Sequence, residues 1–424
     1  MKDYYPLFVV ESYLIFTLLI FFLGPVNFNI HNLELFWMLI VLYHFSFILG
    51  YLIFTKTFHY NKIVYKNKLN DKLFYIICIL AFIGVINAYK NLMMSSTFIP
   101  YNIFDEVVKG ILEPGLSYSE RMSNISSLNN ESDSRIFNIV SIFFSFNKLL
   151  FIFIFIYFWS DLSKFKKIIA VLYSLLFLSS GVASGTNSVV FIFFIFFSFS
   201  YLVITYIENP KIVKRIFIIF IILFLIPLGS FGYIMSQRGG GFEYFSSTSP
   251  LGDISISLDT PLLDSFFGFY TYAIVWLNYY LVQGYYGFSL ILDLDWNWTY
   301  GFGNSEFLQR QFMMLFGIDI SMDTFQHRIT NVWDKSVQWH SFYGQFANDF
   351  GVIGLSILMF MLGAFLSRVW LSVIYSNNLY GMALLPIFML MFIFFPANNQ
   401  IFGYIDTFSY FIFISVFWFF KGRI

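Results

Sequence analysis

The sequence predicts an all-α integral membrane protein with about ten transmembrane helices and one large extracytoplasmic loop between the seventh and the eighth. Three observations predict this class. Of 424 residues, 58% are hydrophobic and 11% are charged, whereas soluble proteins carry about 25% charged residues. Apolar runs of roughly the length that crosses a bilayer recur along the chain. Lysine and arginine gather in alternate connections between these runs, which is typical of cytoplasmic loops.

The apolar runs define the expected spans and divide the chain into three parts. The first part, 1–235, holds seven spans with an outer loop at 95–135. The second, 236–341, is the large extracytoplasmic loop, and the third, 342–424, holds three spans. The spans are expected at 6–23, 35–54, 73–94, 136–159, 168–184, 188–206, 216–235, 342–370, 379–395 and 401–420. Proline and two glycines near the end of the seventh, Pro227, Gly229 and Gly232, predict a bent or unwound outer end.

The positive charges predict that both termini are cytoplasmic. They fill the second, fourth and sixth connections, the end of the eighth span and the C-terminus: Lys56, Lys62, Lys66, Lys68, Lys72, Lys164, Lys166, Lys167, Lys211, Lys214, Arg215, Arg368, Lys421 and Arg423. The stretch 265–292 contains no charge and is long enough to cross the membrane once, which would turn the later positive residues outward. Its tyrosines and glycines favour an interfacial or re-entrant element instead.

The stretch 338–357 carries the chemistry that organises the rest. Read as a helix, it places His340, Gly344, Ala347, Gly351 and Gly354 on one stripe, and Ser341, Gln345, Asn348 and Asp349 on a polar stripe beside it. Small residues let a neighbouring helix approach closely in a membrane. Ionisable residues at membrane depth are costly unless they pair or function. We therefore expect this stretch to be the floor of an active site, with the preceding loop as its roof.

Two residues suit transfer chemistry at a membrane surface. Arg238 is followed by three glycines, so a planar fork of donors and exposed backbone N–H groups are available for a phosphate or pyrophosphate. The alternative is a flexible loop with one interfacial arginine. His340 suits removal of a hydroxyl proton near neutral pH; the alternative is a hydrogen-bonded interfacial anchor. His327 is a second choice for the base.

The spacing His340-Ser341, nine residues, Gly351, two residues, Gly354 resembles the signature of O-antigen ligases and the related Wzy-type O-antigen and oligosaccharide repeat-unit polymerases. The layout is also similar: about ten spans, one long late outer loop, and an arginine soon after the preceding span. Two family features are not matched. Asn187 stands in the turn 184–188 where these families often carry arginine, and no Arg, ten residues, Gly repeat follows Arg238, Arg310 or Arg328.

The resemblance implies a GT-C-like membrane glycosyltransferase of the bacterial plasma (inner) membrane. Its donor and acceptor would be undecaprenyl-diphosphate-linked oligosaccharides, joined with inversion and without a metal or other cofactor. Membrane lipids and a chain-length regulator protein are the expected partners, and nucleic acid is not. Arg238 would hold the donor diphosphate and His340 would activate the acceptor hydroxyl. The substrate would also contact Arg310, Arg328, Lys148, Gln345 and Asn348.

Several further residues were considered for a role in the site. Lys148 lies within an apolar run, and three roles are open for it. It would contact the donor phosphate, pair with Glu11, His44 or Asp406, or extend its amine to the interface. Asp293-Leu294-Asp295 matches the DxD pattern of some metal-binding sites, but we expect this segment to form a turn. Trp276, Trp296, Trp298, Trp333 and Trp339 are expected to stack on sugar rings. The alternatives to a polymerase are an O-antigen ligase and a flippase or other transporter of lipid-linked glycans.

Overall fold

The computed structural model describes residues 2–57, 69–93, 101–128, 135–238, 254–256, 268–335 and 337–421. Among these residues the α-helices are α1 (Tyr5–Leu23), α2 (Leu33–Lys56), α3 (Asp71–Leu92), α4 (Ile103–Leu112), α5 (Pro114–Leu128), α6 (Arg135–Tyr157), α7 (Lys164–Ala183), α8 (Ser188–Glu208), α9 (Val213–Leu223), α10 (Leu225–Arg238), α12 (Gly268–Ser289), α13 (Glu306–Phe316), α14 (Phe325–Arg328), α15 (Phe342–Ser376), α16 (Leu379–Phe394) and α17 (Ile405–Lys421). Short 3-10 turns are η1 (Lys2–Tyr4), η2 (Pro210–Ile212) and η3 (Ser321–Asp323). Strands β1 (Val26–Phe28) and β2 (Ile254–Ile256) pair antiparallel, with Asn27 opposite Ser255.

The described helices confirm the all-α class and a multi-pass membrane protein. Seven helical stretches among the described residues, one of which is η2, α9 and α10 taken together (Pro210–Gln237), are long and apolar enough to cross a membrane, by length and composition. Three shorter apolar helices lie at Asn147–Tyr157, Leu379–Phe394 and Ile405–Phe420. Each of the ten expected spans overlaps one of these ten helices. Connection 58–68, with three of the inner lysines, and most of 239–267 lie outside the described residues.

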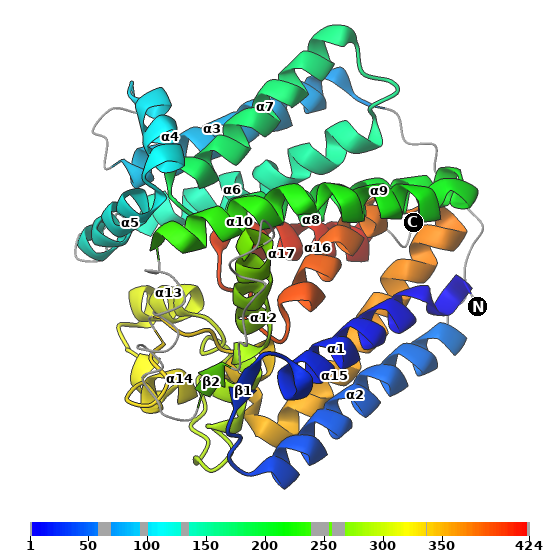
Figure 1. Ribbon diagram of the computed structural model, residues 1–424. Coiled ribbons are helices and arrows are strands. Elements are labelled where there is room, and N and C mark those ends of the chain that lie inside the picture. Colours follow the sequence, from blue (N-terminus) through cyan, green and yellow to red (C-terminus); the bar gives the residue numbers. More distant parts are fainter. Residues whose placement is uncertain are drawn as a thin grey trace.

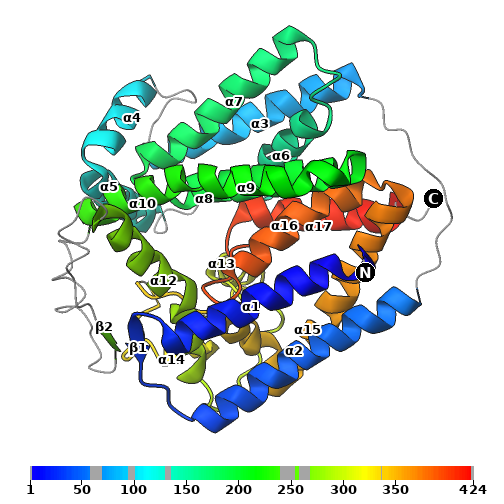
Figure 2. The same ribbon diagram turned by 45° about the vertical axis from the view of Figure 1, so that its right-hand side comes forward.

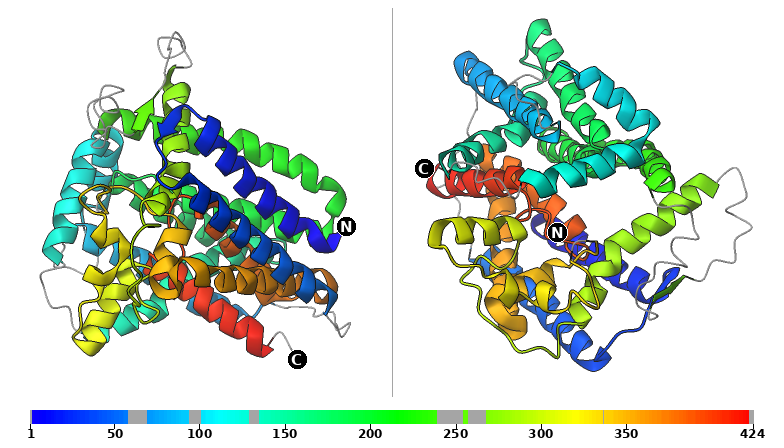
Figure 3. Two further views of the ribbon diagram at one scale, coloured as in Figure 1. Left: turned by 90° about the horizontal axis from the view of Figure 1, so that it is seen from below. Right: turned by 90° about the vertical axis from the view of Figure 1, so that its left-hand side faces the viewer.

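The helices form three groups that are visible in Figures 1 and 2. α3, α6 and α7 lie together at the top, α8 to α10 with α16 and α17 cross the middle, and α1, α2 and α15 lie below. The two chain ends lie at one end of the molecule, and the segment with α13 and α14 lies at the other (Figures 1 and 3). The cytoplasmic placement of both termini stays a prediction.

Helices α2 and α15 approach most closely at glycines other than those expected. A β-carbon on Gly363 would lie 2.1 Å from the carbonyl oxygen of Phe47, and one on Gly50 would lie 2.1 Å from that of Phe360. Backbone therefore packs against backbone at both positions. Gly354, by contrast, has only its own helix within 4 Å, at Phe350. Gly354, at the end of the small-residue stripe of the sequence interpretation, therefore does not pack closely against a neighbouring helix.

The expected bend of the seventh span lies earlier than the sequence suggests. The helical ladder is interrupted at Phe224, between α9 and α10, and α10 then stays helical to Arg238. Pro227 lacks an N–H for the Leu223 carbonyl, so the break falls within the turn before the proline. The prediction of an unwound outer end was wrong because the consequence of a proline appears on its N-terminal side.

Within the stretch 265–292, residues Gly268–Ser289 form α12, which runs across α10 in Figure 1 and not alongside it. Among the described residues, α12 is not one of the helices that are long and apolar enough to cross a membrane. Its second half is deeply buried, with Val282, Tyr285, Tyr286 and Phe288 completely enclosed. The interfacial or re-entrant character of this stretch stays a prediction.

The contrast between Gly363 and Gly354 gives a first prediction. Gly363→Val should lower the free energy of unfolding by about 1–3 kcal/mol, because the added side chain must separate α2 from α15. The measurement is thermal or denaturant unfolding of the purified protein in detergent. Gly354→Ala is the control and should be neutral or slightly stabilising, since it adds one methyl group without a clash. Equal effects of the two substitutions would contradict the described packing.

Candidate functional site

The chain on both sides of His340 is held by α12. The main-chain N–H of Trp339 donates to Gln283 Oε1 (3.1 Å), and that of Ser341 donates to the Gly284 carbonyl oxygen (3.4 Å). Because these bonds fix the backbone before and after the histidine, the position of the imidazole does not depend on its own polar contacts.

Ser341 caps α15. Its hydroxyl oxygen accepts the Gly344 N–H (3.2 Å), and the next N–H, that of Phe342, donates to the Phe395 carbonyl oxygen just after α16 (2.9 Å). A serine at this position satisfies a donor that the helix itself leaves open. The serine of the His-Ser pair is therefore a structural residue, which sets the start and direction of α15.

Two glycines of α12 allow these segments to meet. A β-carbon on Gly284 would lie 2.4 Å and 2.6 Å from the carbonyl oxygens of Pro396 and Ala397. A β-carbon on Gly287 would lie 3.2 Å from His340 Nδ1 and 2.9 Å from the indole nitrogen of Trp333. In the sequence analysis these glycines served only to favour an interfacial or re-entrant element. In the structure they allow the chain to pack closely around the histidine.

The His340 side chain is buried, with 3% of its surface exposed. Within the described residues, neither ring nitrogen has a hydrogen-bond partner. Burial, with a smaller contribution from the nearby positive charge of Lys335, lowers the pKa of His340 from 6.5 to about 3. The imidazole is therefore neutral near pH 7 and offers one nitrogen lone pair and one N–H to a molecule that reaches it.

Other polar groups around His340 are also open. Gln283 Nε2, Gln338 Oε1 and Asn398 Oδ1 are buried and have no hydrogen-bond partner among the described residues. Gln283 adjoins the glycine that contacts the 396–397 backbone, and Asn398 follows that backbone directly. Buried polar groups are nearly always satisfied in folded proteins. A cluster of open donors and acceptors therefore marks this region as the candidate site.

The side chain of Asn348, which was expected to bind substrate, is hydrogen-bonded to the late loop, the long segment between α12 and α15. Its side-chain oxygen accepts the Phe325 N–H (2.8 Å), and its side-chain nitrogen donates to the Gly303 carbonyl (2.9 Å) and to Gln326 Oε1 (2.6 Å). Gln326 in turn donates to the Gly344 carbonyl (2.9 Å). These bonds join the loop to the first two turns of α15, so a substrate would have to displace them to reach Asn348.

Asp349 makes a second attachment to the same loop. Its carboxylate accepts hydrogen bonds from the Thr299 hydroxyl (2.5 Å), the Gly303 N–H (3.0 Å) and the Asn304 side chain (2.9 Å). The Asn304 carbonyl accepts a bond from Asn399 (2.8 Å), which belongs to the turn between α16 and α17. The loop is thus fixed to both structural elements that surround His340.

Gly351 interrupts α15. Its φ of 68° and ψ of 163° are not helical, and the Asn348 carbonyl, which would accept the Val352 N–H in a continuous helix, accepts the indole N–H of Trp296 instead (2.8 Å). Just beyond the break, the Val352 carbonyl accepts the hydroxyl of Tyr43. The Trp296 ring lies against Gly351, 3.2 Å from where a β-carbon would be. The continuous helical stripe expected across this position was therefore wrong.

The other expected substrate residues lie in different surroundings. Gln345 is half-buried and donates to the His340 carbonyl (3.3 Å). Arg310 is exposed on α13. Arg328 donates to the Asp295 carbonyl and lies over the ring of Phe325. None of these contacts assigns a substrate role, and of the three only Gln345 bonds directly to the 338–341 segment in the described structure.

Lys148 shows the pairing that the sequence left as one alternative. Its amine forms an ion pair with Asp406 of α17, and its stem packs against Gly84 of α3 at 3.0 Å from an added β-carbon. The Lys148 carbonyl accepts the hydroxyl of Tyr173 (2.9 Å). The two opposite charges compensate each other within the bundle, and the donor-phosphate role of Lys148 stays a prediction.

The DxD motif and the tryptophans differ in their exposure. Asp293 accepts a bond from Asn32 (2.9 Å), and the residues that the structure describes contain no group of three or more His, Cys, Asp or Glu suited to a metal ion. Trp276 and Trp333 are buried in the packing, whereas Trp298 is 58% exposed. Of the expected stacking residues, Trp298 is therefore the most accessible.

Arg238 is the last residue of α10; its side chain and the glycines after it lie outside the described residues. The body of α10 is connected to the site through aromatic rings. Phe231 lies 5.9 Å from Tyr280 of α12, and Tyr280 lies 4.6 Å from Trp339, centroid to centroid. The helix that ends at Arg238 therefore packs on the same α12 that holds His340.

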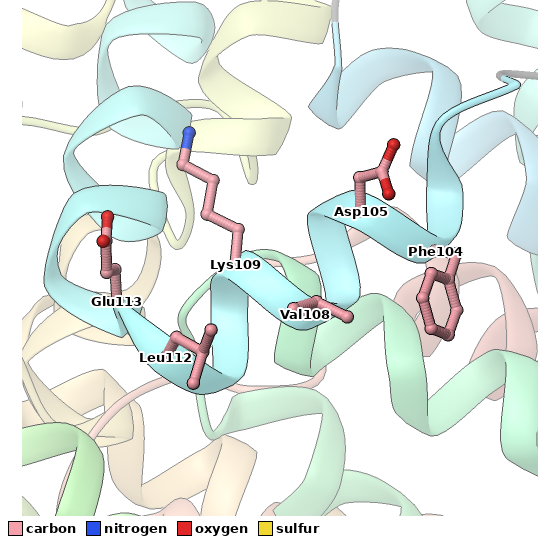
Figure 4. Close-up of a pocket in the computed structure, with 6 residues that line it drawn as sticks. All are labelled: Phe104, Asp105, Val108, Lys109, Leu112 and Glu113. Carbon is pink, nitrogen blue, oxygen red and sulfur yellow. The ribbon is translucent and has the colours of Figure 1, made fainter.

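A shallow surface pocket lies elsewhere. It has a volume of about 340 Å³ and is formed by one face of α4, with Phe104, Val108 and Leu112 beside Asp105, Lys109 and Glu113 (Figure 4). Lys109 forms an ion pair with Glu120 (2.5 Å). The pocket contains no residue of the His340 region.

Sequence reasoning missed the turn between α16 and α17. Residues 396–400, Pro-Ala-Asn-Asn-Gln, are all buried. Three consecutive amides at the end of an apolar run were the available signal, because such residues remain buried only where partners or a ligand satisfy them. The carbonyl oxygens of Pro396 and Ala397, at the start of this turn, lie against Gly284. Asn399, further along the turn, donates a hydrogen bond to the Asn304 carbonyl of the late loop.

A scan against protein-family models finds no match for this chain, and comparisons with curated proteins and with solved structures find none either.

The buried histidine predicts a dependence of stability on pH. The unfolded chain binds a proton to His340 below about pH 6.5, whereas the folded state resists it down to about pH 3. Its contribution to stability is complete above pH 6.5 and decreases as the pH falls. Compared with His340→Asn, the wild type should lose about 2 kcal/mol of unfolding free energy between pH 7 and pH 5. A difference that stays constant over this range would contradict the buried, neutral ring.

The carboxylate of Asp349 gives a second prediction. Asp349→Asn replaces an acceptor oxygen by a donor, which leaves one of its three partners unsatisfied at a cost of about 1–3 kcal/mol. The loop 293–340 should then be cleaved faster in limited proteolysis. Asp323→Asn, which affects one exposed bond to Asn297, is the control and should leave the cleavage rate unchanged. Equal rates for the two variants would exclude an anchoring role for Asp349.

Proposed function

We propose that this chain is an inverting membrane glycosyltransferase that polymerises undecaprenyl-diphosphate-linked oligosaccharide repeat units, as in O-antigen or capsule synthesis, at the outer face of the plasma membrane. The observation that carries the proposal is the buried, neutral His340 ring, whose two nitrogens are open within a cluster of open amides. The resemblance of the His-Ser…Gly…Gly spacing to O-antigen ligases and polymerases supplies the reaction class.

The proposed reaction needs only groups of this kind. A hydroxyl oxygen of the acceptor glycan attacks the anomeric carbon of the donor, and the bond from that carbon to the diphosphate breaks on the opposite face. Undecaprenyl diphosphate leaves, and the hydroxyl proton passes to His340. Because the diphosphate is already a good leaving group, the protein has to supply a base and positive charge, without a nucleotide.

Binding of the donor would also make His340 a better base. In the free protein, burial and Lys335 disfavour the imidazolium. A diphosphate bound nearby would add negative charge and would raise the pKa of the ring toward its ordinary value. The base would then be weak while the site is empty and would become effective only with substrate in place. In this scheme Arg238, at the end of α10, holds the diphosphate.

The open amides support a glycan as the occupant. Gln283, Gln338 and Asn398 present both donors and acceptors, which suits the hydroxyl groups of a sugar. Trp298 and the neighbouring Tyr300 are more than half exposed, and their rings lie 4.8 Å apart. Such an aromatic pair at the loop surface suits stacking on a sugar ring.

The test uses a strain that lacks the chain and is complemented with variants. His340→Ala and Arg238→Ala should abolish long glycan chains while protein abundance and unfolding temperature stay at the wild-type level. Arg215→Ala, an exposed arginine at the start of α9, is the matched control and should restore a normal chain-length ladder. Normal ladders from His340→Ala would exclude its role as the base.

The lipid-linked product that accumulates in the deletion strain separates the candidate reactions. Single repeat units on undecaprenyl diphosphate outside the cell are expected for a polymerase. Full-length polymer on the same lipid would indicate a ligase, and single units retained on the cytoplasmic side would indicate a flippase. Either of these last two results would overturn the polymerase proposal.

A further inference from the structure

Helix α4 has an apolar face that the described part of the protein leaves uncovered. Phe104 is 77% exposed and Leu112 is 67% exposed, and Val108 and Ile111 are exposed at 36% and 53%. The helical repeat brings these positions to one side of α4. These four residues are called the apolar face of α4 below.

The charged side chains of α4 lie on a different side of the helix. In Figure 4 the carboxyl group of Asp105 and the amine of Lys109 extend away from the side on which Phe104 and Leu112 lie. The amine of Lys109 is paired with Glu120 of α5. Asp105 and Glu106 therefore leave the charged side of α4 net acidic. A helix with one apolar and one charged side is suited to lie in the interface of a bilayer.

A third side of α4 packs against the end of α7. A β-carbon on Gly110 would lie 2.0 Å from the Val182 carbonyl oxygen, so the two backbones touch at the last turn of α7. The turn after α7 packs at the junction of α4 and α5, where a β-carbon on Gly185 would lie 2.2 Å from the Pro114 carbonyl oxygen. Figures 1 and 2 show α4 and α5 on the side of the molecule opposite to the chain ends.

The apolar face of α4 continues an exposed apolar side of α7. Val171, Leu172 and Leu175 are each at least half exposed, and α7 is long and apolar enough to cross a membrane. Val182 follows about two helical turns after Leu175 on the same side, and there Gly110 of α4 covers it. The two exposed surfaces therefore adjoin, and the lipid that surrounds α7 extends to α4.

We propose that α4 is an interfacial helix, which places its apolar face among the acyl chains of the leaflet at this end of the bundle. Because the charged side of α4 is net acidic, the apolar face and not attraction to anionic headgroups supplies the binding. This role of α4 depends on the membrane class of the protein and not on the proposed glycosyltransferase activity.

The same contact would fix the depth of α10 in the bilayer. The hydroxyl of Tyr233 on α10 donates to the Ile111 carbonyl oxygen of α4 (3.0 Å). Ser230, also on α10, donates to Asn187 (3.5 Å) in the turn after α7. Since α10 ends at Arg238, a lipid-bound α4 would set the level at which this helix ends.

Spin labels on the full chain test which medium covers α4. The buried Cys78 is replaced by alanine, and Phe104→Cys or Leu112→Cys then supplies one labelling site on the apolar face. Asp105→Cys on the charged side is the matched control. Each chain is placed in phosphatidylcholine nanodiscs at one copy per disc. The accessibility of each label to oxygen and to a water-soluble nickel chelate is measured, and only variants that keep the wild-type unfolding temperature are compared.

The labels at positions 104 and 112 should be reached by oxygen and shielded from the chelate, at a depth of about 5–10 Å below the headgroup boundary. The label at position 105 should be reached by the chelate. Since each disc holds one chain, a second copy cannot produce this result.

Three results would overturn the proposal. Chelate access at all three positions would show that water covers the apolar face. Shielding of positions 104 and 112 from both oxygen and chelate would show that protein covers it. A depth that appears only when phosphatidylglycerol is added would show that headgroup charge, and not the apolar face, holds the helix.

Discussion

The backbone break at Gly351 determines how the candidate site is built. A continuous helix would use the Asn348 carbonyl for its own ladder, but the break gives that carbonyl to the indole of Trp296. The turn of helix before the break then projects Asn348 and Asp349 into the late loop, where their bonds hold residues 299–304 and 325–326. The loop in turn encloses the region of His340. A side chain other than glycine would be strained at this φ.

The sequence was most informative about composition and least informative about contacts. The ten apolar runs could be recognised in the sequence because a membrane requires each crossing segment to have a minimum length of apolar residues, and this is a local property. The break at Gly351 was missed because a helical wheel assumes a regular helix, and only the contact with Trp296, 55 positions earlier, makes the irregular form favourable. The partners of Asn348 could not be predicted for the same reason, since they come from a loop without periodicity.

Charges within the bundle were easier to interpret. A lysine or a glutamate in an apolar run requires a partner, and the candidates for Lys148 were few. The structure pairs Lys148 with Asp406 and Glu11 with His44, so Lys148 and the three partners that the sequence offered for it are all paired. The choice between the combinations depended on which helices are neighbours, and this is a property of the whole fold that no single segment contains.

The main-chain attachment of the 338–341 segment has one more consequence. Hydrogen bonds to Gln283 and Gly284 fix the path of the backbone without using the imidazole, so the ring is carried to its position by the chain and not by its own bonds. Backbone hydrogen bonds thus position the site, and the side chain at position 340 remains available for chemistry. Different side chains at position 340 would be presented at the same point in space, and a new reactivity could be introduced there without rebuilding the scaffold.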